Sequence, residues 1–448
     1  MKRAVVLGGG GSRGSYQMGV WKALDELGYE YDIVCGTSVG ALNGALMVQN
    51  EFEKGMALWS TITTLDVLDI DNPTDFSTLS GRREALAAFI SRFVKEGGVD
   101  PAPLERLLRQ TLDEDKVRSS PVDFGLVTVE FPSMTPLILT KENIPEGMLC
   151  DFLMASAACY PAMKSRQIQG KRYVDGGYHS NLPIEIAINL GADEIVAVDL
   201  ECIGIIRPVH RRDRRIKYIK SHWDLGVFLH FEPQNAYRNM ILGYNDTMKS
   251  FGQYEGEAYT FARFESEHNR DDILARLEAA HLTAGREGEQ HRRFLGRLAQ
   301  SALGRLSGSS PAHISTLTVR RWAEAAGKAL ALDPLPVYTF ADFNRLIQQG
   351  FLQAGERMAE LSLEALASAR SFKDLLGMLT KLDRSFLANY LLGLLQEPKF
   401  GDRQREQLSL AAALTPLEFM AAYYGYALSL PPAGGLLPGA EEPALSDG

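Results

Sequence analysis

The first 200 residues of the sequence predict a three-layer α/β sandwich with a mainly parallel central sheet. Short apolar runs alternate with longer amphipathic stretches along this segment, and alternating strands and helices build folds of this kind. In addition, two glycine-rich turns each follow an apolar run and precede a helical pattern. Strand–turn–helix units join parallel strands, so both observations favour the same fold class.

The period of the apolar residues locates the individual elements. In SYQMGVWKALDELG, for example, Met18, Trp21 and Leu24 recur at helical spacing. We expect strands over residues 3–7, 31–38, 123–131, 135–140, 171–175 and 194–200. We expect helices over residues 15–28, 38–50 and 148–160, a helix that begins near Pro183, and a more helical insertion from Phe52 to about Ser119.

Beyond Leu200 the character of the sequence changes. The segment RPVHRRDRRIKYIK, residues 207–220, is basic, and from about Asp271 the pattern is helical almost throughout. The terminal PPAGGLLPGAEEPALSDG is rich in proline and glycine, a composition typical of disorder. We therefore predict a first domain over residues 1–260, an all-α region over 270–430 and a disordered tail over 431–448.

Composition restricts the function classes. Of the 448 residues, 45% are hydrophobic and 23% are charged, values ordinary for a globular protein with sizeable cores. The net charge of −9 argues against nucleic acid as a partner, because a phosphate-binding surface needs a basic excess. The basic segment 207–220 leaves two interpretations open, namely peripheral contact with anionic lipid headgroups of a membrane or a solvated loop.

Cysteine use and hydrophobicity predict a cytoplasmic location. The four cysteines show neither C-x-x-C spacing nor the density of a disulfide scaffold, which favours a reducing compartment. The start of the sequence has only four apolar residues before its glycines, whereas a secretory signal needs roughly 7–15. No stretch approaches the ~18 consecutive apolar residues of a membrane span.

The first glycine-rich loop suggests a nucleotide, but its surroundings do not. Residues 9–14 read GGGSRG and match the G-x-G-x-x-G fingerprint of dinucleotide-binding proteins. In such a protein an acidic residue ends the second strand about 20 positions later. Here Asp32 opens that strand, and Thr37 and Ser38 follow its carboxyl end. A P-loop is excluded because no lysine follows Gly14. A nucleotide-binding oxidoreductase is therefore the least favoured alternative.

The second glycine motif, GTSVG at residues 36–40, has the pattern of a nucleophile elbow. A strand ends just before it and a helix begins after Ser38, so a sharp turn would expose the serine hydroxyl at the carboxyl edge of the sheet. Gly36 and Gly40 would let the strand and the helix pass closely. The N–H groups of the first glycine loop lie at the same edge, so we expect them to face an oxyanion formed at Ser38.

A third motif, VDGGYHSNLP at residues 174–183, brings a candidate base. A strand is expected to deliver Asp175 to a glycine turn at a carboxyl edge. An aspartate before Gly176 and Gly177 is often only a turn, so its assignment as a base depends on the two other motifs. His179 offers the alternative of a Ser–Asp–His triad, although the sequence has no HGGG-type oxyanion loop.

In this order, the motifs GGGGSRG, GTSVG and DGG resemble those of the patatin-like phospholipase family. The intervening SAACYPAM and the SNLP after the aspartate are also similar to the family's motifs. The stretches DLGVFLHF and NMILGYNDTMKSFG resemble the distal part of some bacterial members, so the resemblance covers roughly residues 1–260.

The resemblance implies a patatin-like fold and a lipid acyl-ester hydrolase, phospholipase A or lysophospholipase, that needs neither cofactor nor metal. Ser38 would be the nucleophile and Asp175 the base of a two-residue dyad, and a phospholipid or another acyl-ester lipid would be the substrate. The oxyanion hole would consist of backbone N–H groups of Gly9, Gly10 and Gly11. The motif positions that support these groups are Arg13, Gly14, Gly36, Gly40, Gly176 and Gly177.

Two points stay open from the sequence. Arg13 either holds the glycine loop in shape or attracts a phosphate headgroup. The same dyad would also serve a thioesterase, a triacylglycerol lipase or an acyltransferase, because it acts only on the acyl carbonyl. In each case we expect burial to raise the pKa of Asp175, which would make it a stronger base near neutral pH.

Overall fold

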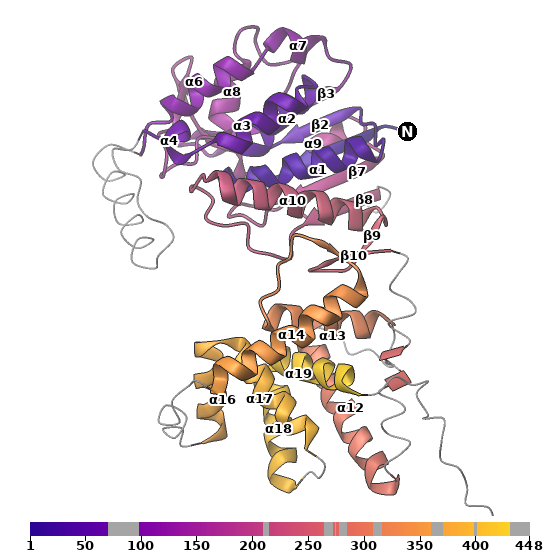
Figure 1. The fold of residues 1–448 in the computed structure, drawn as a ribbon. Helices are drawn as coiled ribbons and strands as arrows, with labels where there is room; N and C mark the ends of the chain where they lie inside the picture. Colours follow the sequence, from indigo (N-terminus) through magenta and orange to yellow (C-terminus); the bar gives the residue numbers. More distant parts are fainter. Residues whose placement is uncertain are drawn as a thin grey trace, which may run out of the picture. The chain divides into compact units, whose positions relative to one another are not determined.

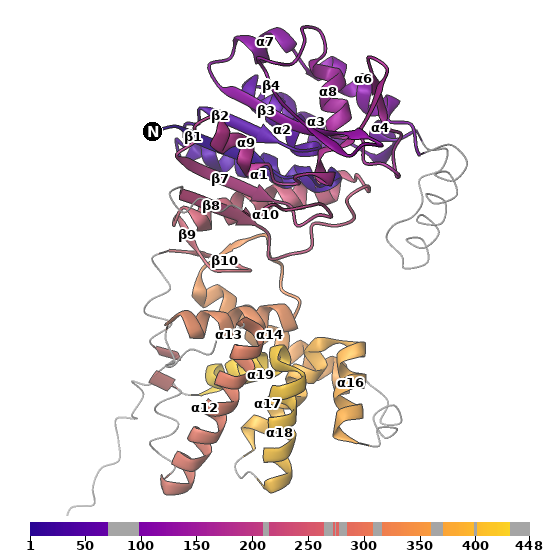
Figure 2. The same cartoon turned by 180° about the vertical axis from the view of Figure 1, so that it is seen from behind.

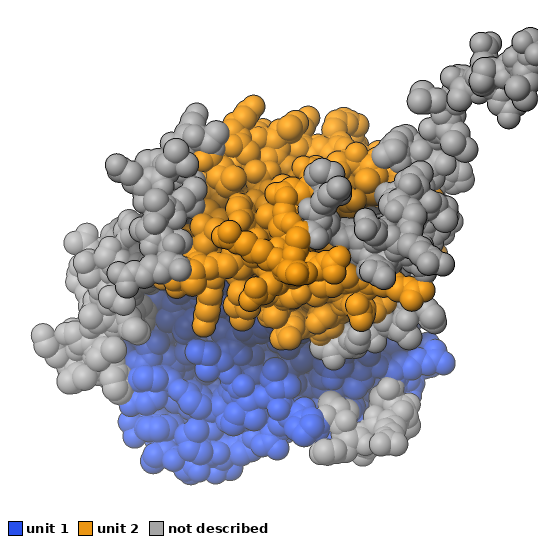
Figure 3. Space-filling model, turned by 90° about the horizontal axis from the view of Figure 1, so that it is seen from below, with its two compact units in different colours: residues 1–253 blue, residues 254–448 orange. Residues whose placement is uncertain are grey.

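A computed structural model provides the structure of the chain. It describes residues 1–69, 98–208, 215–263, 272–273, 275–276, 285–307, 316–359, 371–397 and 401–430. The chain divides into two compact units, Met1–Gln253 and Tyr254–Gly448, which Figure 3 colours separately. Each unit is described by itself below. The predicted tail over 431–448 lies outside the described residues.

The first unit is built on an eight-stranded sheet in the order β5-β6-β3-β2-β1-β7-β8, with β4 paired to β3. The strands are β1 (Arg3–Leu7), β2 (Ile33–Gly36), β3 (Asp123–Phe131), β4 (Thr135–Thr140), β5 (Arg166–Ile168), β6 (Lys171–Asp175), β7 (Glu194–Asp199) and β8 (Arg215–Lys220). The pairs β3-β2, β2-β1, β1-β7 and β7-β8 are parallel. The predicted fold class, with a mainly parallel sheet, is confirmed.

Helices cover both faces of this sheet (Figures 1 and 2). They are α1 (Ser15–Glu26), α2 (Val39–Val48), α3 (Phe52–Thr61), α4 (Thr64–Val67), α6 (Ala102–Thr111), α7 (Glu114–Ser119), α8 (Leu149–Ser156), α9 (Ile184–Asn189) and α10 (Pro233–Ser250). On β1, Ala4 and Val6 share a core cluster with α9. Leu7 points to the other face, where a Cβ on Gly44 of α2 would touch it at 3.8 Å. The sheet is therefore the middle of three layers.

The turn between β2 and α2 brings helix and strand into close backbone contact. A Cβ on Gly40 would lie 2.2 Å from the carbonyl oxygen of Leu7, and one on Gly36 would lie 2.2 Å from that of Gly40. No side chain fits at either position. The two glycines thus allow the start of α2 to rest directly on β1.

The direction of β6 was not foreseen from the sequence. This strand is antiparallel to β3, with Asp175 opposite Thr128. However, β3 continues beyond its partner β2, whose last residue, Gly36, lies opposite Leu126. The carboxyl end of β6 therefore reaches the same edge of the sheet as the turn after β2, although the strand arrives from the opposite direction.

The insertion after α2 and the basic segment differ in part from their expected form. The insertion is helical where it is described, in α3, α4, α6 and α7, while residues 70–97 lie outside the described part. In the basic segment, residues 215–220 form β8, which pairs with β7. The interpretation as a loop is therefore wrong for these six residues, and residues 209–214 are not described.

The second unit is mainly helical, as predicted, but it also contains a small sheet. The helices are α12 (Gly285–Ser307), α13 (Thr316–Ala329), α14 (Phe340–Ala359), α16 (Phe372–Leu382), α17 (Arg384–Gln396), α18 (Asp402–Leu414) and α19 (Pro416–Ser429). The strands β9 (Tyr254–Glu255), β10 (Thr260–Ala262) and β11 (Val337–Tyr338) form the sheet. Helix α19 is central: its Tyr423 packs edge-on against Trp322 of α13. Among the described helices, none combines the length and apolarity that a membrane crossing requires.

Candidate active site

Ser38 lies in the sharp turn between β2 and α2, with φ 55° and ψ −130°. A non-glycine residue with positive φ is strained and persists only where its surroundings hold it. Here the Ser38 N–H donates to Oγ of Ser156 at 3.0 Å, and that hydroxyl donates to the carbonyl oxygen of Val127 at 2.7 Å. The adjacent Thr37 donates through Oγ1 to the carbonyl oxygen of Ser180 at 2.7 Å. These contacts fix the turn from two neighbouring segments.

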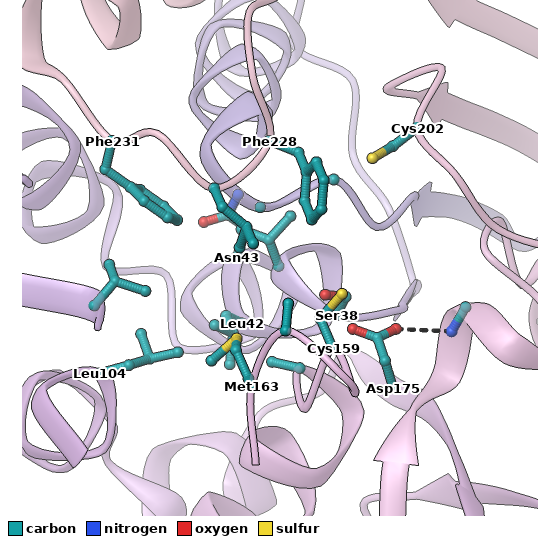
Figure 4. Close-up of a pocket in the computed structure, with 18 of the residues that line it drawn as sticks. Ser38, Leu42, Asn43, Leu104, Cys159, Met163, Asp175, Cys202, Phe228 and Phe231 are labelled. Atoms are coloured by element: carbon teal, nitrogen blue, oxygen red, sulfur yellow. Dashed lines mark hydrogen bonds between the residues drawn. The ribbon is translucent and has the colours of Figure 1, made fainter. Parts of the chain in front are cut away.

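Asp175 ends β6 and is 7% exposed. Its Oδ1 accepts a hydrogen bond from the Gly177 N–H at 2.8 Å, inside the short 3₁₀ turn that begins at Gly176. The carboxylate faces Ser38 (Figure 4). Burial raises the pKa of Asp175 to about 6, although the hydrogen bond from the Gly177 N–H and the nearby Ser38 hydroxyl oppose this rise. The structure therefore joins the candidate nucleophile and the candidate base.

The glycine loop lies against Ser38 and offers two unoccupied N–H groups. A Cβ on Gly9 would be 3.1 Å from the Cβ of Ser38. The N–H of Gly9 already donates to the carbonyl oxygen of Asn181 at 3.0 Å. In contrast, the N–H groups of Gly10 and Gly11 donate to no acceptor in the described ranges. Of the three predicted oxyanion donors, only these two are available.

The directions of these two N–H groups are fixed by the carbonyl that precedes each of them. A trans peptide is planar, so its C=O and the following N–H point in opposite directions. The Gly9 carbonyl accepts from Nδ2 of Asn181 at 3.3 Å, and the Gly10 carbonyl accepts from the Arg13 N–H at 3.2 Å. Gly10 and Gly11 line the cavity described below. Asn181 thus orients one donor, a role that its place in SNLP did not reveal.

The guanidinium of Arg13 holds the loop to neighbouring segments. Nε donates to the carbonyl oxygen of Gly226 at 2.9 Å, and Nη1 donates to those of Leu200 at 3.1 Å and Glu201 at 2.8 Å. Arg13 is not among the residues that line the cavity. Of the two roles left open for this residue, these contacts support that of holding the loop in shape.

A chain of buried amides connects the loop to Trp59 of α3. The indole Nε1 donates to Oδ1 of Asn43 at 3.0 Å. Asn43 Nδ2 donates to Oε1 of Gln17 at 2.8 Å and to the carbonyl oxygen of Gly14 at 3.0 Å. Gln17 Nε2 then donates to the carbonyl oxygen of Gly8 at 2.7 Å. Because an indole only donates, it fixes the orientation of both amides, which in turn hold the two ends of the loop.

A cavity of about 600 Å³ begins at Ser38 and is mostly apolar. Its apolar wall comes from α2, α3, α4, α6 and the loops that follow α8, β6, β7 and β8, and every lining residue belongs to the first unit. The apolar lining residues of the helices and of the segment after α3 are Val39, Leu42, Leu46, Leu58, Trp59, Ile62, Val67, Leu104, Leu107 and Leu108. The loops contribute Met163, Val227, Phe228, Leu229 and Phe231 (Figure 4). The helical insertion, which had no predicted role, therefore supplies much of the wall.

Two other predicted features lie apart from this site. His179 does not line the cavity; its carbonyl oxygen accepts from Nε of Arg207 at 2.9 Å, and its Nδ1 lies 3.0 Å from Nη2 of the same arginine. Burial and the Arg207 charge lower the pKa of His179. Asp32 sits at the amino end of β2, where its carboxylate accepts from the Arg3 N–H at 2.8 Å. Neither the triad nor the nucleotide alternative gains support.

No group of His, Cys, Asp and Glu side chains within the described ranges is arranged to hold a metal ion. The polar groups around Ser38 are instead hydrogen-bonded to one another or to the backbone, as described above. Around Ser38 the described residues present a hydroxyl, a carboxylate and two backbone N–H donors.

Comparison with known proteins agrees with this geometry. Residues 5–188, which contain the glycine loop, the elbow and the DGG turn, match the family model of patatin-like phospholipases. Residues 5–188 are a patatin-like phospholipase domain. The family match ends within α9, so β7, β8, α10 and the second unit lie beyond it.

Among curated proteins, similar patatin-like sequences occur in much longer chains. One is "Neuropathy target esterase sws" of Drosophila melanogaster, 28% identical over 209 residues, which are 44% of this chain and 13% of that protein. Another is "Lysophospholipase nte1" of Aspergillus terreus, 29% identical over 216 residues, which are 46% of this chain and 12% of that protein. The match thus spans about an eighth of these relatives.

Two solved structures show a weak overall likeness. VipD from Legionella pneumophila aligns with 94% of this chain and 91% of its own, at 14% identity and a TM-score of 0.34. The type III effector protein ExoU aligns with 94% and 88%, at 16% identity and a TM-score of 0.32.

Proposed function

We propose that this protein hydrolyses acyl esters of lipids, as a phospholipase A or lysophospholipase, through a Ser38–Asp175 dyad. The observation that carries the proposal is one arrangement at the sheet edge. A strained serine faces a buried carboxylate, beside two unoccupied N–H groups and at the start of an apolar cavity.

In the proposed reaction Oγ of Ser38 attacks the acyl carbonyl while Asp175 takes the hydroxyl proton. The N–H groups of Gly10 and Gly11 stabilise the negative charge on the carbonyl oxygen. Asp175 then passes the proton to the leaving alcohol, and the acyl group stays on Ser38. Finally, Asp175 takes a proton from water, which attacks the acyl-enzyme; the acyl–Oγ bond breaks, Asp175 returns the proton to Oγ of Ser38, and a fatty acid is released. A carboxyl pKa of about 6 suits both steps, because a base near its pKa both accepts and returns a proton.

The cavity supports a long acyl chain as the group that is transferred. Its volume of about 600 Å³ lies within the range of small-molecule sites, and apolar walls favour an apolar ligand. The names of the relatives, an esterase and a lysophospholipase, agree with an ester of this kind. A thioesterase, a triacylglycerol lipase and an acyltransferase remain alternatives, which product analysis on a panel of esters, thioesters and acceptor alcohols distinguishes.

The proposed nucleophile is tested with a fluorophosphonate probe. Such a probe phosphonylates an activated serine, so we expect the wild type to be labelled and Ser38→Ala to be neither labelled nor active. Ser133→Ala is a matched control, since Ser133 is an exposed serine in the β3–β4 turn, and it should be labelled like the wild type. Equal labelling of the wild type and Ser38→Ala would refute the role of Ser38.

The pH dependence tests the proposed base. Asp175 must be ionised to accept the proton, so kcat/KM should rise with pH, with an apparent pKa of about 6, and stay level above it. The measurement is a pH profile with a soluble ester, for the wild type and His179→Ala. An acid limb that moves or disappears in His179→Ala would mean that the histidine, and not Asp175, is the titrating group.

Peripheral membrane contact through the basic segment 207–220, and a cytoplasmic location, stay predictions. Several cations of this segment make contacts within the first unit. Lys217 donates to the carbonyl oxygen of Ser250 at 2.6 Å, and Lys220 pairs with Glu201 at 2.9 Å. These two side chains are therefore not simply available to lipid headgroups.

A further inference from the structure

The loop after β7 exposes an unusual set of apolar side chains. Ile203, Ile205 and Ile206 are 89%, 51% and 50% exposed, and they lie within four consecutive positions. Tyr178, in the turn after Asp175, is 40% exposed. Single exposed apolar residues are common, but a cluster of them on one loop usually marks a surface that binds something.

The backbone of this loop is fastened to the turn that carries Asp175. The Ile205 N–H donates to the carbonyl oxygen of Gly177 at 2.9 Å, and the Ile205 carbonyl accepts from the Asn181 N–H at 2.7 Å. Between the isoleucines, a Cβ on Gly204 would lie only 2.6 Å from the Cβ of Asn181. The loop is therefore held against the residues around the site. These contacts fix the backbone at Ile205 and Ile206, whose side chains are exposed.

The exposed surface continues into the cavity. Ile203, Gly204 and Tyr178 all line the cavity, although Ile203 and Tyr178 are also open to the outside. The hydroxyl of Tyr178 donates to the carbonyl oxygen of Tyr160, which lines the cavity too. We call Tyr178, Ile203, Ile205 and Ile206 the isoleucine rim: Tyr178 and Ile203 line the cavity and are also exposed, and Ile205 and Ile206 continue the exposed apolar surface along the same loop.

We propose that the isoleucine rim docks on the surface of a lipid bilayer and turns the cavity opening toward it. This inference rests on the proposed function. With the rim on the bilayer, an acyl chain that moves from the bilayer to Ser38 would stay in contact with apolar groups throughout. A tyrosine beside the isoleucines fits the boundary between headgroups and acyl chains. The exposed Arg207, next to Ile206, is bonded through its guanidinium to the carbonyl oxygen of His179, so the apolar side chains supply the attraction.

Charge indicates which lipids the rim should bind. The chain carries a net charge of −9, so a general attraction to anionic membranes does not drive docking. Burial of apolar side chains does not depend on headgroup charge. Docking should therefore be measurable on zwitterionic phosphatidylcholine vesicles and change little when phosphatidylglycerol is added.

The test compares vesicle flotation of the full chain with its hydrolysis of a soluble short-chain ester. Ile205→Ser/Ile206→Ser alters the rim at two residues that do not line the cavity. Met134→Ser/Tyr237→Ser is the matched control: these residues of the first unit are 45% and 63% exposed and do not line the cavity. We expect the rim variant to bind vesicles at least about tenfold more weakly, with the control unchanged and with equal hydrolysis of the soluble ester by all three proteins.

A second pair of variants gives a positive signal that does not depend on activity. Ile206→Trp should show a blue-shifted emission with vesicles and quenching by brominated lipid, whereas Met134→Trp should show neither. Wild-type binding by the rim variant, or an Ile206→Trp emission that vesicles leave unchanged, would overturn the proposal. So would a rim variant that loses a dimer in solution and keeps its vesicle binding, because the rim would then cover a second copy.

The same experiment separates this proposal from the proposed function. If no ester is hydrolysed but vesicle binding depends on the rim, docking is supported and the hydrolase proposal fails. If the soluble ester is hydrolysed and the rim variant binds vesicles like the wild type, the hydrolase proposal is supported and docking fails.

Discussion

Asp175→Asn is expected to lower kcat by at least about 10³-fold, in line with the loss of a general base. An amide cannot take the hydroxyl proton of Ser38, but its oxygen can still accept the hydrogen bond from the Gly177 N–H. The fold should therefore survive, which near-ultraviolet circular dichroism checks. In the same series His179→Ala should keep most of the activity, because His179 does not line the cavity. Opposite results for the two variants would favour a triad.

The same substitution should make the protein more stable at neutral pH. Burial raises the pKa of Asp175 from its ordinary 3.8 to about 6, which corresponds to about 3 kcal/mol for keeping this carboxylate ionised in the folded state. A neutral asparagine avoids that cost. If Asp175 were instead part of a stabilising buried ion pair, the same substitution would lower the free energy of unfolding.

The stability gained by Asp175→Asn should depend on pH. Below about pH 4 the carboxyl is protonated in both the folded and the unfolded chain, so its ionisation costs nothing. Between pH 4 and 6 the unfolded chain loses the proton first, and the free energy of unfolding of the wild type falls. Urea denaturation at pH 4 and pH 7.5 measures this: the advantage of Asp175→Asn should appear only at the higher pH. Equal advantage at both values would exclude Asp175 ionisation as its cause.

Gly11→Ala should lower kcat by about 10²–10³-fold, the usual cost of losing an oxyanion donor. Gly11 has φ +55°, and a Cβ there would lie 2.0 Å from the carbonyl oxygen of Phe228. That oxygen accepts the Ser12 N–H at 2.7 Å, so the side chain would push apart the contact that fixes the loop. The N–H groups of Gly10 and Gly11 would then no longer point together at the carbonyl oxygen of the substrate.

Gly28→Ala is the matched control for this variant. Gly28, after α1, has a similar φ of +63°, but a Cβ there meets nothing within 4 Å. It should lose about 1 kcal/mol of stability from backbone strain alone and keep its activity. If Gly28→Ala lowers kcat as much as Gly11→Ala does, the loss reflects strain in general and not the oxyanion loop.

Local signals in the sequence were sufficient for the fold class and for selecting Ser38 and Asp175 as candidates, which the structure places near each other. The alternation of apolar runs marks β1, β2 and β3, and the glycines at 36 and 40 mark the only kind of turn that lets α2 pass so close to β1. Asp175 was recognisable because it stands between a strand and two glycines. Each of these features depends on residues close together in the chain.

Features that depend on distant pairing were not predictable in the same way. The antiparallel direction of β6 follows from its partner β3, which lies about 45 residues earlier in the chain, as the pairing of Thr128 with Asp175 shows. The acceptor of the Gly9 N–H is the carbonyl oxygen of Asn181, which lies far along the sequence. The small sheet of the second unit pairs β10 with β11 across a helical region. No local pattern distinguishes such partners from ordinary polar or apolar residues.

In the proposed hydrolase, the amide chain from Trp59 to Gly8 limits how the cavity could be redesigned for other acyl lengths. Trp59 is part of the cavity wall, stacked on Phe231, so it is an obvious residue to shrink when a roomier pocket is wanted. Yet its N–H orients Asn43 and Gln17, and through them both ends of the glycine loop. Selectivity and turnover are therefore tied together at this residue. Leu104 and Leu107 of α6 line the same cavity with purely apolar side chains, and substitutions there would widen it without touching the loop.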